Sequence, residues 1–278
     1  MNYEKITEHA WLDRTGETPF LFFPVLRDLG IRHGFSTRLG GVSQGCYATM
    51  NLGFRRGDSE ENVIENYRRI CSAIGIVPED LVFTDQVHKT NIRVASASDK
   101  GKGYCRERDY EEIDGHITDE ENLPLLAFAA DCVPLYFVDP VRRAIGLAHS
   151  GWKGTAAGIG AVTVDRLAKV YNSRREDIVA VIGPSIGPDC YEVGAEVREV
   201  FGTHYTKEQL EECFRPSTRP DRYLLDLWTA NQIVLTQAGL RPDHIIISGA
   251  CTWSLPELFF SHRRSGGNRG SMAAFLCL

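Results

Sequence analysis

Residues 125–155 read LLAFAADCVPLYFVDPVRRAIGLAHSGWKGT, and this stretch decides the expected fold. It holds three apolar runs that favour strands, at Leu125–Ala130, Leu135–Asp139 and Ala144–His149. A glycine-containing turn follows and leads into a helical pattern over Thr155–Tyr171. Three successive strands and a helix in this order predict a layered α/β arrangement.

The same patterns extend through the rest of the chain. Apolar residues at helical spacing follow the capping-box sequence Asp58-Ser59-Glu60-Glu61 and predict a helix that ends at Gly75. Shorter helices are expected at Gly194–Phe201 and Leu227–Ala238. Further strands are expected at Leu21–Val25, Ile31–Ser36, Leu81–Gln86, Ile92–Ala95, Ile178–Ile182, Ile245–Ser248 and Met272–Leu276.

The order of these elements also bears on the architecture. Strands and helices alternate loosely rather than in strict βαβ units, which predicts a mixed sheet, or two packed sheets, with helices outside. The charged run Ser98–Glu112 is expected to be an exposed loop or insertion. No segment resembles a long linker, so we expect a single domain over residues 1–278.

Composition limits the function classes. The chain has 278 residues, 31 basic and 37 acidic side chains and a net charge of −6. An acidic balance argues against broad electrostatic binding of nucleic acid or of an anionic membrane. The N-terminus lacks the pattern of a secretory signal, and the eight cysteines form no Cys-x-x-Cys pair. We therefore expect reduced, mostly core cysteines and a cytoplasmic location.

Three residues carry the side chains of a candidate metal site. Cys132 and His149 each stand where an apolar run meets a turn, and His88 ends another such run. One thiolate and two imidazoles suit Zn²⁺ with a fourth position left for a reactant, the arrangement of a catalytic zinc. Spacing alone also fits a buried packing cysteine and a hydrogen-bonded histidine at a strand end. Both interpretations remain open on the residues alone.

Glycine-rich segments with cationic side chains form a second group of candidates. Ser150–Thr155 fits an anion site at a helix start, or a plain turn with Thr155 as the N-cap. Phe35–Gly41 and His262–Arg269 fit recognition of phosphate or carboxylate, or a solvated basic surface. In Gly183–Tyr191 the prolines favour a stiff turn over a nucleophilic role for Ser185.

Eight motifs in fixed order resemble one known family. They are Gly34-Phe35-Ser36-Thr37-Arg38, Asn51-Leu52-Gly53, Gln86-Val87-His88, Asp114-Gly115, Ala130-Asp131-Cys132, Ala148-His149-Ser150-Gly151-Trp152-Lys153-Gly154, Gly183-Pro184-Ser185-Ile186 and Phe259-Phe260-Ser261-His262-Arg263-Arg264. The chain resembles the YfiH-type laccase-domain family, also called polyphenol oxidase or peptidoglycan editing factor, from about Gly34 to Leu278. The resemblance implies a purine nucleoside phosphorylase that also deaminates adenosine and phosphorolyses methylthioadenosine.

The resemblance also implies a fold and a metal. The family fold is an α/β layered sandwich, α-β-β-α with mixed sheets, related to the catalytic domain of cytotoxic necrotizing factor toxins. The family's metal-binding residues fall on His88, Cys132 and His149. Zinc is the expected cofactor, and copper an adventitious or alternative metal. His262 departs from the family, where this position often carries Tyr.

The implied activity needs further residues around the metal. Purine nucleosides and inorganic phosphate are the expected partners, with neither nucleic acid nor membrane. Arg38 and Arg264 are candidate phosphate-binding residues, and Asn51 and Gln86 are candidate polar contacts to substrate. Asp131 is either an acid/base for deamination, with His88, Cys132 and His149 as the catalytic group, or a residue that caps a turn.

Two other enzyme classes compete with this interpretation. A polyphenol oxidase with several coppers is disfavoured because the eight histidines include no His-x-His pair. A cysteine hydrolase that edits peptidoglycan precursors would use Cys132 as nucleophile and His149 as base. His88 separates the two remaining classes, since a second imidazole beside a thiolate is better explained by zinc.

Overall fold

The stretch 125–155 forms three strands, and the last two are an antiparallel hairpin at the centre of a sheet. The computed structural model describes residues 2–54 and 56–278. Ser150 pairs with Val133 and His149 with Pro134, so the segments that carry Cys132 and His149 meet at the same end of the hairpin. This six-stranded sheet has the order β15 (Ile245–Ile247), β11 (Val179–Ile182), β9 (Val133–Asp139), β10 (Ala144–Ser150), β7 (Gly115–Thr118) and β6 (Ile92–Val94).

A second large sheet packs against the first. Both sheets are mixed: the first pairs β11 with β15 and β6 with β7 in parallel, and the second pairs β5 (Val82–Phe83) with β8 (Leu125–Ala129) in parallel, while the other neighbouring strands are antiparallel. The seven strands of the second sheet have the order β1 (Tyr3–Lys5), β2 (Trp11–Asp13), β3 (Phe20–Phe22), β4 (Arg32–Ser36), β16 (Met272–Cys277), β8 (Leu125–Ala129) and β5 (Val82–Phe83).

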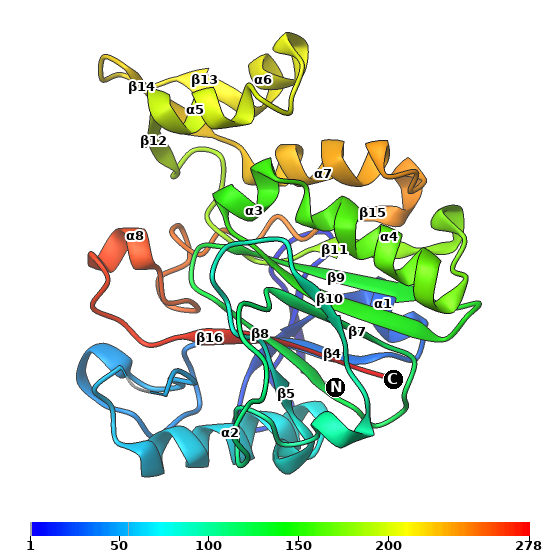
Figure 1. Cartoon of the computed structure of the whole chain (residues 1–278). Coiled ribbons are helices and arrows are strands. Elements are labelled where there is room, and N and C mark those ends of the chain that lie inside the picture. The colour runs from blue at the N-terminus through cyan, green and yellow to red at the C-terminus, as the bar shows by residue number, and fades with distance from the viewer. Residues whose placement is uncertain (1, 55) are drawn as a thin grey trace.

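Three hydrophobic cores define the layers. One core joins residues of both sheets, such as Phe35 and Tyr136, so the sheets pack face to face. A second lies between the seven-stranded sheet and α2 (Glu60–Ile74). A third lies between the six-stranded sheet and the helices on its outer face, as Figure 1 shows. These helices are α3 (Trp152–Ala156), α4 (Ile159–Tyr171) and α7 (Leu227–Gln237). The expected order α-β-β-α with mixed sheets is confirmed, and the relation to the toxin domain stays a prediction.

Smaller elements complete the chain. A three-stranded sheet lies beyond α7 with two short helices (Figure 1). It consists of β12 (Glu192–Gly194), β14 (Arg222–Leu225) and β13 (Phe214–Pro216), with α5 (Ala195–Phe201) and α6 (Lys207–Cys213). The remaining helices are α1 (Pro24–Asp28) and α8 (His262–Ser265), with 3₁₀ turns at Gly45–Tyr47, Pro78–Asp80, Ala97–Asp99, Arg175–Asp177 and Pro242–His244.

The structure corrects several local expectations. Each of the ten predicted strands overlaps an observed strand, but the one expected at Leu21–Val25 ends at Phe22, and Pro24 and Val25 begin α1. Sequence patterning missed the short strands β1, β2, β7, β12, β13 and β14. The helix expected at 155–171 is two helices, because Gly158 adopts a left-handed conformation between them. Gly151 is the N-cap of α3, and Thr155 lies inside that helix. Ser59 is the N-cap of α2 but makes no side-chain capping bond.

Other composition-based expectations have mixed outcomes. All eight cysteines are described and unpaired, but only Cys71, Cys213 and Cys277 are buried. Among the described residues, no helix combines the length and apolar character needed to cross a bilayer. The run 98–112 forms a loop after the 3₁₀ turn Ala97–Asp99, but it is not exposed throughout, because Asp99 and Lys102 are buried. The single domain stays a prediction.

Candidate metal centre and substrate cleft

His88, Cys132 and His149 come together where three segments meet. His88 lies in the connection between β5 and β6, Cys132 between β8 and β9, and His149 in β10. One ligand atom from each lies within 4.8 Å of the others, and Cys132 Sγ is 3.9 Å from His88 Nε2. The two imidazoles meet edge to face, with ring centroids 4.7 Å apart. The predicted convergence of these three side chains is thus present.

Asp114, at the residue before β7, holds both histidines in place. Its fully buried carboxylate lies 3.0 Å from His149 Nδ1, which leaves Nε2 to face the other two ligands. The same carboxylate accepts the backbone N–H groups of Val87, His88 and Lys89 at 3.2, 3.0 and 2.8 Å. A carboxylate behind a ligating histidine fixes the ring orientation and the tautomer. Sequence reasoning gave Asp114 no role, although its motif Asp114-Gly115 was in view.

The backbone around the triad has little freedom. His88 has φ +63°, a left-handed conformation that non-glycine residues rarely adopt, and the three N–H bonds to Asp114 hold that turn. A Cβ at Gly151 would lie 2.6 Å from His88 Cδ2 and 3.2 Å from Cys132 Sγ. The absence of a side chain at Gly151 therefore leaves room for His88 and Cys132 to lie close together.

The triad side chains perturb one another's protonation. Burial opposes ionisation of the Cys132 thiol, but the adjacent His149 and His88 outweigh it and lower the thiol pKa to about 6. Burial likewise opposes the charge on His149, yet the Cys132 thiolate and the Asp114 carboxylate raise its pKa to about 9. Near neutral pH the metal-free corner thus holds a thiolate beside an imidazolium.

The donor set fits a zinc ion. Tetrahedral zinc, with sulfur at about 2.3 Å and nitrogen at about 2.0 Å, places those two atoms about 3.5 Å apart. The separation between Cys132 Sγ and His88 Nε2 is 3.9 Å, so little movement is needed. Within residues 2–54 and 56–278, this is the one group of three or more His, Cys, Asp or Glu side chains with ligand spacing.

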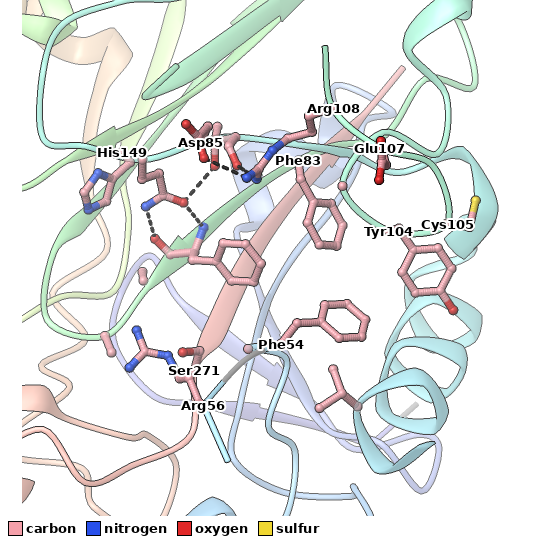
Figure 2. A pocket seen from close by; sticks show the side chains of 18 of the residues that line it. Phe54, Arg56, Phe83, Asp85, Tyr104, Cys105, Glu107, Arg108, His149 and Ser271 are labelled. Carbon is pink, nitrogen blue, oxygen red and sulfur yellow. Dashed lines mark hydrogen bonds and ion pairs between the residues drawn. The ribbon is translucent and has the colours of Figure 1, made fainter. Parts of the chain in front are cut away.

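The triad occupies one end of a cleft of about 1450 Å³. Figure 2 shows His149 at one end, Tyr104 and Cys105 at the other, and Phe54 and Phe83 between them. Phe83 contacts Phe128 edge to face, with centroids 5.4 Å apart, and the Phe54 and Tyr104 rings lie within 6.5 Å of the Phe83 ring. The expected loop 98–112 supplies part of this wall. An aromatic surface of this kind suits a planar heterocycle.

Two arginines on the cleft wall were not singled out by the sequence. Arg269 is 9% exposed, and its Nη1 donates to Gly270 O at 2.8 Å and to Ser271 Oγ at 3.1 Å. Arg56 lines the same wall, beside Ser271 in Figure 2. Arg269 lies within the loop 262–269 that we associated with oxyanions, but the sequence alone cannot tell which of its arginines faces the cleft.

Arg38 and Arg264, the predicted phosphate-binding residues, lie outside the lining of the cleft. The Arg38 guanidinium donates to the carbonyl oxygens of Ala48 and Pro256. That of Arg264 donates to the carbonyl oxygens of Thr252, Trp253 and Phe259. Both side chains connect loops. The structure brings neither to the metal corner, and their role in binding phosphate stays a prediction.

Asn51 and Gln86, the predicted polar contacts, differ from each other. Gln86 lines the cleft, but its amide is bonded to the backbone N and O of Phe128 at 2.7 and 2.9 Å. Asn51 is fully buried, and its Oδ1 accepts from the backbone N of Gly53 and of Ser271. Gln86 therefore reaches the cleft as part of its wall, and Asn51 lies behind the wall.

Asp131 caps a turn, which is one of the two roles that the sequence left open. Its carboxylate accepts from Thr252 Oγ1 at 2.7 Å, Ser261 Oγ at 3.0 Å and Arg263 N at 2.7 Å. These bonds cap the start of α8, and Asp131 lies outside the lining of the cleft. The geometry does not support an acid/base role for Asp131.

Fold and site together define a class: a layered α/β protein with one thiolate and two imidazoles at the end of an aromatic cleft. The family described as multi-copper polyphenol oxidoreductase laccase matches residues 32–278. The chain belongs to this laccase-domain family, as the motifs predicted.

Individual relatives agree with this assignment. Purine nucleoside phosphorylase YlmD of Bacillus subtilis is 38% identical over 247 residues, which cover 87% of each chain. The Geobacillus stearothermophilus protein of the same name is 38% identical over 271 residues, covering 96% of this chain and 94% of its own. The crystal structure of the Bacillus licheniformis hypothetical protein YfiH superposes with a TM-score of 0.90 at 35% identity and covers 96% of this chain and 98% of that one.

Proposed function

We propose that the chain is a zinc-dependent purine nucleoside phosphorylase that acts on adenosine, inosine, guanosine and methylthioadenosine and also deaminates adenosine to inosine. The observation that carries this proposal is the convergence of His88, Cys132 and His149 at the end of an aromatic cleft. The names of the relatives, purine nucleoside phosphorylase, support the reaction class. We keep the cytoplasm as the predicted location.

The residues of the metal corner can hold a zinc ion, with three of them as ligands and a fourth orienting one ligand. His88 Nε2, His149 Nε2 and Cys132 Sγ would be its ligands, and Asp114 would orient His149. When bound, zinc supplies Lewis-acid polarisation of a substrate oxygen or nitrogen. His149 can hold a proton on Nδ1 against Asp114 throughout turnover, because that carboxylate is fully buried and keeps its hydrogen bond.

Phosphorolysis then depends mainly on positioning. A phosphate oxygen forms a bond to C1′ of the ribose, the bond from C1′ to N9 breaks, and the departing purine takes up a proton. The rings of Phe54, Phe83 and Phe128 would hold the base, and a cationic wall would hold the phosphate. Holding two reactants in this way can contribute about 7–11 kcal/mol.

Deamination would use the same corner of the cleft. Water supplies the oxygen that replaces the C6 amino group, and ammonia leaves with the proton that the reaction must deliver. Phosphate takes no part in this second reaction, so the two activities can be separated by experiment.

One observation favours a second candidate, a cysteine hydrolase that edits peptidoglycan precursors. In the metal-free protein, Cys132, His149 and Asp114 have the order of nucleophile, base and orienting carboxylate. His88 has no part in such a mechanism, although Asp114 holds it as firmly as His149. A multicopper oxidase is less well supported, since the described residues offer one three-ligand group and no cluster of further imidazoles.

A nucleoside panel on metal-quantified protein tests the proposal. Adenosine, inosine, guanosine and methylthioadenosine are each incubated with and without inorganic phosphate, and the products are separated by chromatography. We expect free base and ribose 1-phosphate, or the methylthio sugar phosphate, only when phosphate is present. Equal base release without phosphate would indicate hydrolysis instead. Activity that resists chelators and is lost with iodoacetamide would favour the cysteine hydrolase.

A further inference from the structure

We infer that Arg269, Arg56 and Ser271 form an oxyanion subsite beside the metal corner, that it binds inorganic phosphate, and that Asn51 positions it. The identity of the anion rests on the proposed function, whereas the presence of an oxyanion subsite rests on the geometry. The sequence places Arg269 in a segment expected to recognise phosphate or carboxylate but does not single it out, it gives Arg56 and Ser271 no such role, and it predicts that Asn51 touches substrate directly.

Arg269 is the first observation. Its guanidinium is nine-tenths buried on the cleft wall, and no described carboxylate lies within ion-pair distance of it. Its buried Nε donates no hydrogen bond to any described residue. Burial, helped by the charge of Arg56, lowers its pKa to about 10, so it is cationic at neutral pH. A buried cation with a free N–H is a costly arrangement unless a ligand completes it.

The surroundings of Arg269 are shaped for an anion. A Cβ at Gly53 would lie 2.8 Å from Ser271 Oγ and 3.0 Å from Arg56 Cδ, so only glycine leaves this space open. Ser271 Oγ already accepts from Arg269, and its own hydrogen remains available to a ligand. Two guanidinium groups and a hydroxyl around one opening suit a tetrahedral oxyanion, because guanidinium binds two oxygens in parallel.

Asn51 connects the two arginine-bearing segments. Its Oδ1 accepts from Gly53 N at 3.0 Å and from Ser271 N at 2.9 Å, and its Nδ2 donates to Asp58 at 2.9 Å. Through these bonds one buried amide fixes the loop that carries Arg56 against the strand start that follows Arg269. The motif Asn51-Leu52-Gly53 thereby acquires a physical reason: an amide to join two loops, and a glycine to keep the space between them open.

The neighbouring carboxylates do not compete for this position. Asp131 is close enough to raise the pKa of Arg269, but its oxygens are already bonded to Thr252, Ser261 and Arg263. Asp58 accepts from Asn51 and Ser59. Arg269 and Cys132 line the same cleft, and the Cys132 thiolate is close enough to act on the charge of Arg269. An anion held by Arg269 would therefore lie beside the metal corner, where a nucleoside would present C1′.

The test compares Arg269→Gln with wild type and with Arg142→Gln, on zinc-loaded protein. Arg142 is exposed in the turn at the opposite end of the β9–β10 hairpin. With a saturating nucleoside, we expect Arg269→Gln to raise the KM for phosphate about 10- to 100-fold, because it removes charge-assisted hydrogen bonds. The KM for nucleoside and the phosphate-independent deamination of adenosine should change less than about threefold. Arg142→Gln should match wild type in every measurement.

A calorimetric titration with inorganic phosphate, in the absence of nucleoside, separates the oxyanion subsite from the proposed phosphorylase function. Wild-type binding that is lost in Arg269→Gln would support the subsite even if no nucleoside is phosphorolysed, in which case only the proposed function fails. Phosphorolysis by Arg269→Gln with an unchanged KM for phosphate would overturn the subsite and leave the function intact. Equal weakening of nucleoside and phosphate would also overturn it, since it would indicate general damage to the cleft.

Two further variants cover the failure of Arg269→Gln to fold, which circular dichroism would show. Arg56→Gln alters an exposed side chain, and we expect it to raise the KM for phosphate about tenfold. Asn51→Ser shortens the positioning amide and should raise the same KM without changing the KM for nucleoside. If neither variant shifts the KM for phosphate, the subsite is wrong.

Discussion

Asp114 and Asp131 are both buried carboxylates beside the candidate metal corner, and they hold different halves of the site. Asp114 bonds to His149 and to three backbone N–H groups around His88, so it fixes ligands. Asp131 bonds to the N-terminal turn of α8, so it fixes the segment that leads to Arg269. One carboxylate serves the histidines, and the other serves the cationic loop.

This difference shows how poorly chain proximity measures involvement in a site. Asp131 precedes Cys132 in the chain, yet its side chain points to residues 252–263. Asp114 is far from both histidines in sequence and contacts both in the fold. Asp131 has φ +87°, and this left-handed turn sends its side chain away from that of its neighbour. The following predictions test the division between the two carboxylates.

The largest effect is expected at Cys132, because its thiolate is one of the three candidate metal ligands. Cys132→Ala removes the thiolate ligand, and we expect zinc to be lost on dialysis and phosphorolysis to fall at least about a thousandfold. Metal analysis and a phosphorolysis assay measure the two losses. Cys46→Ala, a partly exposed cysteine outside the cleft, is the matched control and should keep both properties. Full activity in Cys132→Ala would remove the triad from the mechanism.

The next effect is expected at Asp114. Asp114→Asn keeps the shape of the side chain but weakens the hold on His149 and on the turn at His88. We expect zinc affinity to fall about 10- to 100-fold, as for other residues that orient ligating histidines. Competition with a chromophoric chelator measures this affinity. Unchanged affinity would mean that the His88 turn and His149 keep their positions without the carboxylate.

Asp131→Asn should show the opposite pattern. Asparagine tolerates the left-handed backbone at this position, so the change tests the charge. We expect the free energy of unfolding to fall by about 2 kcal/mol, because three hydrogen bonds lose their charged acceptor. Zinc affinity should stay within about threefold of wild type. Denaturant unfolding measures the free energy of unfolding, and the same chelator competition measures the zinc affinity. A loss of zinc affinity as large as that of Asp114→Asn would erase the distinction between the two carboxylates.

The parts of the fold that the sequence could predict are those where periodicity and burial coincide. The strands β8, β9 and β10 are almost continuously buried, so their apolar runs identified them directly. The short strand β1 is half-exposed and has no pattern that distinguishes it from a loop. The break between α3 and α4 depends on one residue, Gly158, whose left-handed conformation apolar spacing cannot reveal.

In the candidate site, too, some residues could be identified from the sequence and others could not. His88, Cys132 and His149 could be found because thiol and imidazole at strand ends are rare and their motifs are distinctive. The arginines could not be assigned, because Arg38, Arg56, Arg264 and Arg269 all stand in glycine-containing loops. What separates them is where the guanidinium lies: those of Arg38 and Arg264 bond to loop carbonyl oxygens outside the cleft, whereas Arg56 and Arg269 line the cleft. That depends on loop packing, which no local pattern encodes.

The smallest effect concerns protonation of the metal-free corner. Cys132 has a pKa lowered to about 6, so its thiolate, and with it the alkylation rate, is lost as the pH falls through 6. Asp114 raises the pKa of His149, and the imidazolium in turn favours the thiolate. Asp114→Asn should therefore move the pKa of Cys132 upward, whereas Asp131→Asn should leave it in place.

A shift of one unit, from about 6 to about 7, would lower the thiolate fraction about eightfold at pH 5.5 and hardly at all above pH 9. Iodoacetamide labelling of metal-free protein across this range, read at Cys132 by peptide mass spectrometry, measures the shift. Cys71 and Cys213 provide internal references, because burial raises the pKa of each thiol well above its ordinary value and keeps it unreactive. If Asp131→Asn moved the profile as far as Asp114→Asn, the charge near Cys132 would come from both carboxylates, and only their hydrogen-bond partners would still distinguish them.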